Sequence, residues 1–122
     1  MKLSICNVYD NGKDSEYVML KVEEDCNLKN YILYDETFDE EGNPSNKWPH
    51  MYRLKNLDVK KGEYVSIHTC GEEKYKKGKT KKGSDCHIFC RGLAEPVFNQ
   101  EGDKAHLVQI NDEDESVVTP TE

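Results

Sequence analysis

Short runs of alternating apolar and polar residues recur along this chain, and no stretch shows the periodicity of a helix. Residues 17–22 give the clearest early example, because Val18, Leu20 and Val22 fall on one face at a period of two. Residues 64–70 repeat this pattern later in the chain. These runs predict half-buried β-strands.

Eight such runs are separated by polar or glycine-containing segments, and Tyr31 and Leu33 share a face in the third. In the run at 64–70, Val65 and Ile67 point inward while Ser66 and His68 point outward. The predicted strands cover residues 3–8, 17–22, 31–34, 51–54, 64–70, 86–91, 105–110 and 116–119. Loop insertions are predicted at about 36–50 and 71–85.

Composition supports the same fold class. The chain holds two Ala against nine Val, five Ile and seven Tyr, and β-branched and aromatic residues suit a pleated surface. A length of 122 residues is typical of a single domain, so we expect one domain over residues 1–122. The prediction is an all-β protein, a sandwich of about eight strands.

The formal net charge of −7 argues against binding of nucleic acid or an anionic membrane by the whole surface. No stretch approaches the roughly 18 apolar residues of a membrane span, and residues 1–6 lack the apolar core of a signal peptide. The five cysteines are odd in number. We therefore expect a cytoplasmic protein with free thiols and no membrane partner.

The order of several segments resembles the lamin-tail domain family. Residues 16–20 (EYVML) resemble its second strand, and 28–35 (LKNYILYD) resemble its "dLsGW-x-L-x-D" segment. Residues 57–65 resemble its "pG-x-hydrophobic" turn and strand, and 98–107 (FNQEGDKAHL) resemble "W-N-N-x-G-D-x-A-x-L". The resemblance covers roughly residues 3–119 and implies an immunoglobulin-like β-sandwich. It also implies a function that is most often non-catalytic, as in most members of that family.

This sequence departs from the family pattern at several positions. Asn30 stands at the family glycine, Tyr31 and Phe98 stand at its two tryptophans, and Gln100 stands at its second asparagine. The segments inserted at about 36–50 and 71–85 have no counterpart in the pattern.

Polar residues gather in the segment 96–107, where they suggest either polar catalysis or a cation site. The alternative is a structural turn, in which Gly102 adopts a conformation that suits glycine and the side chains of Asn99 and Asp103 accept backbone N–H groups. We favour the turn, with Phe98 and Leu107 as its anchors in the core.

Thiols and imidazoles flank the lysine-rich segment. If the two flanking strands pair as a long hairpin, a remote zinc site is formed by His68, Cys70, Cys86 and Cys90. Cys86 and Cys90 lie about 13 Å apart along a strand, too far for one ion without a bulge. Cys86 and His87 are adjacent and point to opposite faces, which argues against a catalytic dyad. We expect no metal and no cofactor.

Six of the chain's lysines lie within nine residues, around one tyrosine. One interpretation of this run is a solvated hairpin loop, whose charges prevent the sheet edge from pairing with another chain. The other is a mobile basic arm that binds nucleic acid weakly, with its tyrosine free to stack on a base. The candidate nucleic-acid-binding residues are Lys74, Tyr75, Lys76, Lys77, Lys79, Lys81 and Lys82.

The long loop at 36–50 offers a second candidate surface. Its aromatic and imidazole side chains are either anchors for a protein partner or a cover over the end of the core. The candidate protein-binding residues are Phe38, Trp48 and His50.

No carboxylate pair, nucleophile–base pair or phosphate-cradling glycine loop is present in the sequence, so we do not expect an enzyme. The function that we expect is a non-enzymatic interaction module. It would bind a protein through its loops or a sheet edge, with weak nucleic-acid binding through 74–82 as the alternative. The oligomeric state stays open.

Overall fold

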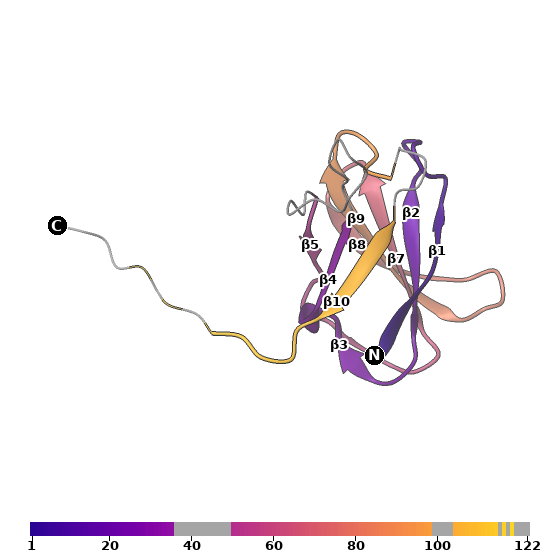
Figure 1. Cartoon of the computed structure of the whole chain (residues 1–122). Helices are drawn as coiled ribbons and strands as arrows, with labels where there is room; N and C mark the ends of the chain where they lie inside the picture. Colours follow the sequence, from indigo (N-terminus) through magenta and orange to yellow (C-terminus); the bar gives the residue numbers. More distant parts are fainter. Residues whose placement is uncertain (36–49, 99–103, 115, 117, 119–122) are drawn as a thin grey trace.

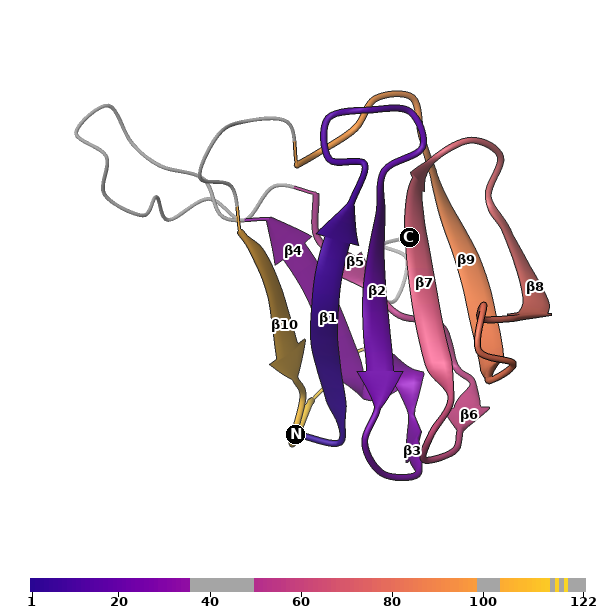
Figure 2. The same cartoon turned by 90° about the vertical axis from the view of Figure 1, so that its right-hand side faces the viewer.

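The structure is a computed structural model that describes residues 1–35, 50–98, 104–114, 116 and 118. This part of the chain is all-β, as the alternation predicts, and its one helical element is a 3-10 turn at Leu28–Asn30. No helix in it is long and apolar enough to cross a membrane. Figures 1 and 2 together label the ten strands of this part of the chain. They are β1 (Leu3–Tyr9), β2 (Tyr17–Val22), β3 (Cys26–Asn27), β4 (Tyr31–Asp35), β5 (Tyr52–Arg53), β6 (Asp58–Val59), β7 (Tyr64–Cys70), β8 (Lys74–Lys79), β9 (Asp85–Leu93) and β10 (Ala105–Gln109).

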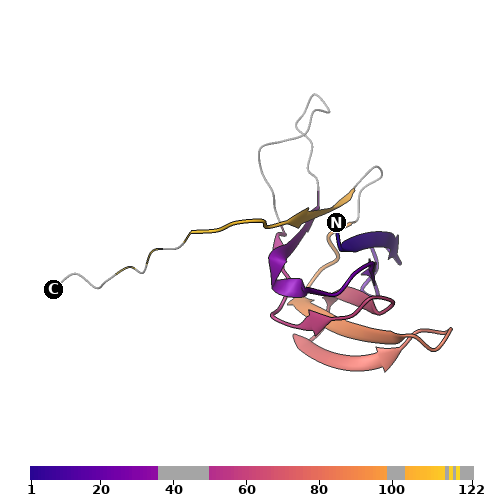
Figure 3. The same cartoon turned by 90° about the horizontal axis from the view of Figure 1, so that it is seen from below.

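Two main sheets and one short strand pair are present in the described residues. The larger sheet has five strands in the order β1-β2-β7-β9-β8, and the smaller sheet has the order β10-β4-β5. Figure 2 looks onto the larger sheet, with β4 and β5 behind it, and Figure 3 shows both sheets from below. Within the larger sheet only β7 and β9 run parallel to each other.

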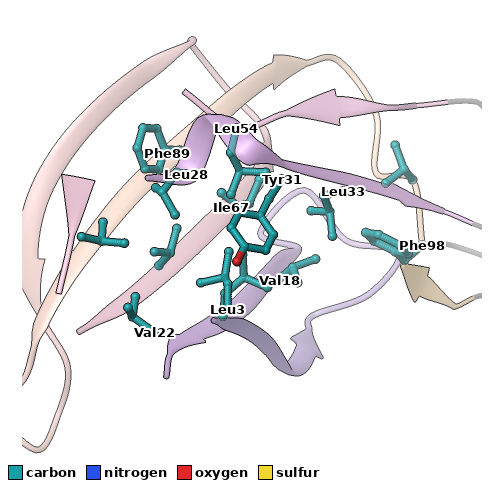
Figure 4. Close-up of a cluster of buried hydrophobic side chains, with 14 residues drawn as sticks. Leu3, Val18, Val22, Leu28, Tyr31, Leu33, Leu54, Ile67, Phe89 and Phe98 are labelled. Atoms are coloured by element: carbon teal, nitrogen blue, oxygen red, sulfur yellow. The ribbon is translucent and has the colours of Figure 1, made fainter. Parts of the chain in front are cut away.

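The hydrophobic core draws side chains from both main sheets, and the predicted inward faces are confirmed. In Figure 4, Tyr31 from the smaller sheet reaches toward Leu3 and Val18 of the larger one. Because each strand contributes every second residue, the outward positions of the larger sheet stay available for other roles. The buried core residues are Leu3, Val18, Leu20, Val22, Leu28, Tyr31, Leu33, Leu54, Val59, Val65, Ile67, Phe89, Val97 and Phe98.

A buried carboxylate ties three segments together at one end of the core. Glu16 is 0% exposed, and it accepts a 2.6 Å hydrogen bond from the Thr69 hydroxyl. Its oxygens also accept the backbone N–H groups of Gly12, Val97 and Phe98 at 2.9–3.0 Å. Such charge-assisted bonds offset the cost of burying the charge, so Glu16 fixes where the chain leaves β9.

Seven of the eight predicted strands correspond to strands of the structure. The eighth, predicted at 116–119, lies partly outside the described residues, and Ser116 and Val118 belong to no strand. Three strands were not predicted: β3, β6 and β8. The last of these lies within 71–85, which we expected to be a loop.

The hairpin of residues 64–70 with 86–91, on which the remote zinc site depends, does not form. β7 and β9 run parallel, and β8 with its connection lies between them in the sequence. β8 itself pairs with β9 antiparallel, through a turn in which the Gly83 N–H donates to the Thr80 carbonyl at 3.0 Å. Residues 71–85 therefore connect the parallel strands β7 and β9, and they also contribute the edge strand β8.

Candidate ligand-binding face

Outward side chains of the larger sheet line up in rows that run across its strands. The register places Tyr9 opposite Tyr17, Tyr17 opposite His68, His68 opposite Cys90, and Cys90 opposite Lys74. Neighbouring strands lie about 4.8 Å apart, so these five residues span roughly 19 Å. We call them the cross-strand row.

A second row lies one side-chain repeat further along the strands. It runs from Asn7 on β1 through Met19, Ser66 and Ile88 to Lys76 on β8. Each row therefore ends in a lysine at the β8 edge of the sheet. The interior of the two rows holds aromatic, apolar or small side chains, so positive charge is concentrated at one edge.

A β-bulge in β1 brings Tyr9 onto this outward face. Leu3 and Ile5 contribute to the core at the expected period of two, which would place Tyr9 inward as well. The register shifts between Ile5 and Asn7, so one extra residue, Cys6, reverses the phase. Val8 then packs against the core, and Tyr9 is exposed on the outside.

Three rings of the cross-strand row stack on one another. The ring centroids of Tyr9 and Tyr17 are 5.0 Å apart, and those of Tyr17 and His68 are 4.8 Å apart. The interplanar angles are 24° and 25°, so the stack runs across the strands with its planes nearly parallel. The stack ends at His68, because the next position in the row is the small side chain of Cys90.

Two hollows lie on this face, and His68 and Ile88 line both. The first, of about 360 Å³, is lined by His68, Cys70, Gly71, Glu72, Lys74, Lys76, Ile88 and Cys90. The second, of about 450 Å³, is lined by Tyr9, Tyr17, Met19, Ser66, His68, Lys79, Thr80, Lys81, Cys86 and Ile88. Volumes of this size accommodate small organic ligands.

The lysine-rich segment is divided between the two faces of its strand. Lys74 and Lys76 line the first hollow, and neither forms an ion pair with a described residue. Lys77 and Lys79 both pair with Asp85 on β9, the former at 3.6 Å. Lys81 lines the second hollow, while Lys82 is exposed in the turn. Within β8, the lysines without an ion pair to a described residue are therefore Lys74 and Lys76, the outward ones.

Tyr75 belongs to a hydrogen-bonded network and not to a mobile arm. Its ring lies 4.8 Å from that of Phe89, and its hydroxyl lies 2.8 Å from Nδ1 of His87. Nε2 of His87 lies 3.1 Å from a carboxylate oxygen of Glu63, which also accepts the Lys60 N–H at 2.7 Å. Tyr75 is therefore part of the edge strand β8; its side chain is 45% exposed, and its stacking on a base stays a prediction.

The ionisation state of Glu63 decides which atom donates the hydrogen bond between Glu63 and His87. Burial would raise the pKa of its carboxyl, but hydrogen bonds from the Lys60 N–H and from His87 hold the pKa below its usual range. An ionised carboxylate only accepts, so Nε2 of His87 donates its proton to Glu63, while Nδ1 bonds to the Tyr75 hydroxyl. Every polar atom of the His87 ring has a partner.

His68 has a different environment. Burial lowers the pKa of its imidazole, and the positive charges of Lys76 and Lys74 lower it further. Its ring contact is the stack on Tyr17. At neutral pH His68 is therefore an uncharged ring that lies between an aromatic stack and two lysines.

The remote zinc ligands do not converge. His68, Cys70 and Cys90 line the first hollow and Cys86 the second, yet no three His, Cys, Asp or Glu side chains of the described ranges form a group that could hold a metal ion. Burial raises the pKa of the Cys70 and Cys86 thiols, which keeps them protonated. Cys86 and His87 face opposite sides of β9, as the alternation predicts.

Of the predicted protein-binding residues, His50 alone is described; Phe38 and Trp48 lie outside the described residues, as do Asn99, Gly102 and Asp103 of the predicted turn. Nδ1 of His50 lies 3.1 Å from a carboxylate oxygen of the buried Asp35. Its φ of 59° is left-handed, and its carbonyl accepts a hydrogen bond from Arg91. His50 is thus held where the long loop rejoins the sheet, and the protein-binding surface stays a prediction.

No protein-family model, no curated protein and no solved structure matches this chain. The resemblance to lamin-tail domains therefore remains a prediction.

Sequence reasoning did not single out Tyr9 and Tyr17, although both belong to the cross-strand row. The signal for Tyr17 was present, because the alternation that places Val18 inward places Tyr17 outward. The sequence holds no such signal for Tyr9, because the outward position of Tyr9 depends on the bulge at Cys6. The outward position of His68 was predicted from the same alternation in residues 64–70.

Proposed function

We propose that this chain is a non-enzymatic binding module whose outward face on the larger sheet binds single-stranded nucleic acid. One observation carries the proposal: the stacked rings of Tyr9, Tyr17 and His68 lie in one row with Lys74. Single-strand-binding surfaces combine stacking rings with lysines that follow the phosphates. This surface has both.

The charge distribution favours weak and local binding. With a net charge of −7, the chain repels a polyanion over most of its surface. Lys74 and Lys76 form a local positive patch, because they line one hollow side by side and neither is paired with a described carboxylate. Two phosphate contacts give a modest affinity that falls as salt rises, with a slope of only about 1.4 in log affinity against log salt.

An enzymatic role has less support. Acyl or thiol chemistry requires a nucleophile near a base, and the buried thiols have raised pKa values while His87 turns away from Cys86. Both ring nitrogens of His87 are engaged by Glu63 and Tyr75. The thiols and His87 thus show no arrangement of a nucleophile beside a base among the described residues.

The proposal includes an immunoglobulin-like β-sandwich of the lamin-tail type. Two main sheets that share one core, and a larger sheet that begins β1-β2-β7, support it. Glu16, the first residue of the segment that resembles the family's second strand, holds Val97 and Phe98 at the start of the segment that resembles its most distinctive stretch. A structural role of this kind explains why a charged residue precedes that strand.

Two variants with the same charge change test the binding proposal. The first, Lys74→Ser with Lys76→Ser, removes the outward lysines; the second, Lys60→Ser with Lys61→Ser, removes two lysines of the turn before β7. The turn is held by the backbone N–H groups of Lys60 and Lys61, which serine retains. Both variants therefore keep the fold and differ only in where the charge is lost.

Fluorescence anisotropy with a labelled single-stranded 12-mer at low salt is the measurement. We expect the first variant to bind roughly tenfold more weakly and to lower the slope of log affinity against log salt by about 1.4, since each phosphate contact contributes about 0.7. The second variant should match the wild type. Equal affinity in both variants, or no binding by the wild type at any salt concentration, would show that the proposal is wrong.

A further inference from the structure

The cross-strand row has a gap at one position. From β1 to β7 it carries large rings, at Tyr9, Tyr17 and His68, and on β8 it carries Lys74. Between them stands Cys90, whose thiol is turned toward the backbone and lies 2.9 Å from the Cys70 carbonyl. The first hollow lies at this gap, since His68, Cys90 and Lys74 all line it.

The width of the gap suits one planar ring. His68 and Lys74 are two strand spacings apart, or about 9.6 Å. A ring in van der Waals contact with a neighbour on each side needs about 3.5–4 Å per contact. One ring fits between His68 and Lys74, and two do not. The cavity volume of about 360 Å³ accommodates a base together with its sugar.

The orientation of His68 also suits a stacked ring. Its plane is nearly parallel to that of Tyr17, with an interplanar angle of 25°, so the stack continues in the direction of Cys90. One face of the imidazole is covered by Tyr17, and the His68 side chain also lines the hollow. Ile88 provides an apolar floor beside it. A planar ring here would extend the stack by one member.

The charged groups around the hollow suit a ring that carries a phosphate. Lys74 and Lys76 are at the β8 side, and Glu72 contributes one negative charge at the rim. Burial and the two lysines keep His68 uncharged, because they lower its pKa. The net charge of these groups is therefore positive on the side away from the ring stack.

We infer that the hollow between His68 and Lys74 is a base-binding slot, in which one nucleobase of a single strand stacks on His68 while Lys74 and Lys76 hold the adjacent phosphate. The inference rests on the proposed function and deepens it, because it places a specific contact within that face. It predicts that the bases, and not only the phosphates, contribute to affinity.

The test compares an oligothymidylate with a strand of equal length and charge in which all the bases are absent. Base stacking on a protein ring contributes enough that the wild type should bind the abasic strand roughly tenfold more weakly. His68→Ala should reduce this ratio toward one. His68→Phe, which keeps a planar ring, should retain it.

His106→Ala is the matched control. His106 on β10 also stacks on a tyrosine, Tyr34, with ring centroids 4.9 Å apart, but it belongs to the smaller sheet. This variant should keep the wild-type ratio. A second readout needs no variant, since the ring protons of His68 should shift upfield in NMR spectra when oligothymidylate is added.

The outcomes separate the two proposals. If neither strand binds, the proposed function itself is wrong. If both strands bind the wild type equally, nucleic-acid binding stands and the base slot does not exist. A ratio that survives in His68→Ala would place base stacking elsewhere on the face and overturn the slot, as would loss of the ratio in His68→Phe.

Discussion

His68 and His87 lie on neighbouring parallel strands of one sheet, but their rings point to opposite faces and have opposite environments. His87 is 5% exposed, and both of its ring nitrogens have hydrogen-bond partners, in Tyr75 and Glu63. His68 borders two hollows, stacks on Tyr17 and has two unpaired lysines nearby. The residue type is the same, and the surroundings decide its role.

The difference shows how to separate a structural histidine from one available for binding. Removing a partner from a saturated buried group leaves polar atoms without hydrogen bonds, which costs stability. Removing a half-buried ring that has no hydrogen bond to a described residue costs less stability, but it removes a surface on which a ligand can stack. The two histidines should therefore respond in opposite ways when stability and binding are measured separately.

The largest expected effect is on stability, in His87→Ala. Truncation leaves the half-buried Glu63 carboxylate without its imidazole partner and the Tyr75 hydroxyl without its ring-nitrogen partner. We expect the free energy of unfolding to fall by about 2–4 kcal/mol. His68→Ala should lower it by less than about 1 kcal/mol. Urea unfolding followed by circular dichroism measures both.

His68→Ala is the internal control in that experiment, because it removes the same atoms from the other face of the sheet. If the two variants lose equal stability, the distinction between His87, whose ring nitrogens are both hydrogen-bonded, and His68, on the outward face, does not hold.

A smaller effect on stability is expected for Tyr75→Phe. This change keeps the ring packed against Phe89 and removes only the hydroxyl that bonds to His87. The loss of one hydrogen bond should cost about 1 kcal/mol. Affinity for the 12-mer should stay unchanged, because Tyr75 belongs to the His87 network. A drop in affinity without a drop in stability would instead place Tyr75 on the binding surface, as its position in the lysine-rich segment first suggested.

The inward faces of these strands were predictable, and the partners of the strands were not. Alternation in residues 17–22 and 64–70 identifies which side chains are buried, because burial of one face follows from the period of two. The same alternation is compatible with either direction of pairing. A hairpin of 64–70 with 86–91 was therefore as compatible with the pattern as the parallel pairing of β7 and β9.

Two further features had no signal in the pattern. β8 contains five polar or glycine residues and Tyr75, and it is a strand because its backbone pairs with β9 at the sheet edge. The bulge at Cys6 moves Tyr9 to the outward face, and a bulge depends on the fit of two paired strands, which no local residue pattern encodes. The candidate site required both features, so the sequence indicated its lysines and His68 but not their alignment.

The smallest expected effect concerns the proton on His68. Its pKa is lowered in the folded protein by burial and by Lys76 and Lys74. The unfolded chain therefore binds this proton more readily, and the contribution of His68 to stability is present above the ordinary pKa of about 6.5 and lost as pH falls through the folded pKa. Glu63 acts in a separate pH range. The stability that its lowered pKa contributes is present above about pH 4.3 and is lost as pH falls below that value.

Proton NMR titration of the His68 ring tests this assignment directly. Lys74→Ser with Lys76→Ser should raise the His68 pKa toward its ordinary value, because two nearby positive charges are removed. The Lys60 and Lys61 double variant should leave it unchanged. Adding the 12-mer to the wild type should also raise the pKa, since a phosphate held by Lys74 and Lys76 offsets the positive charge that lowers it, and binding should therefore tighten as pH falls. A His68 pKa that responds to neither the lysine substitutions nor the 12-mer would mean that Lys74, Lys76 and His68 do not form one site.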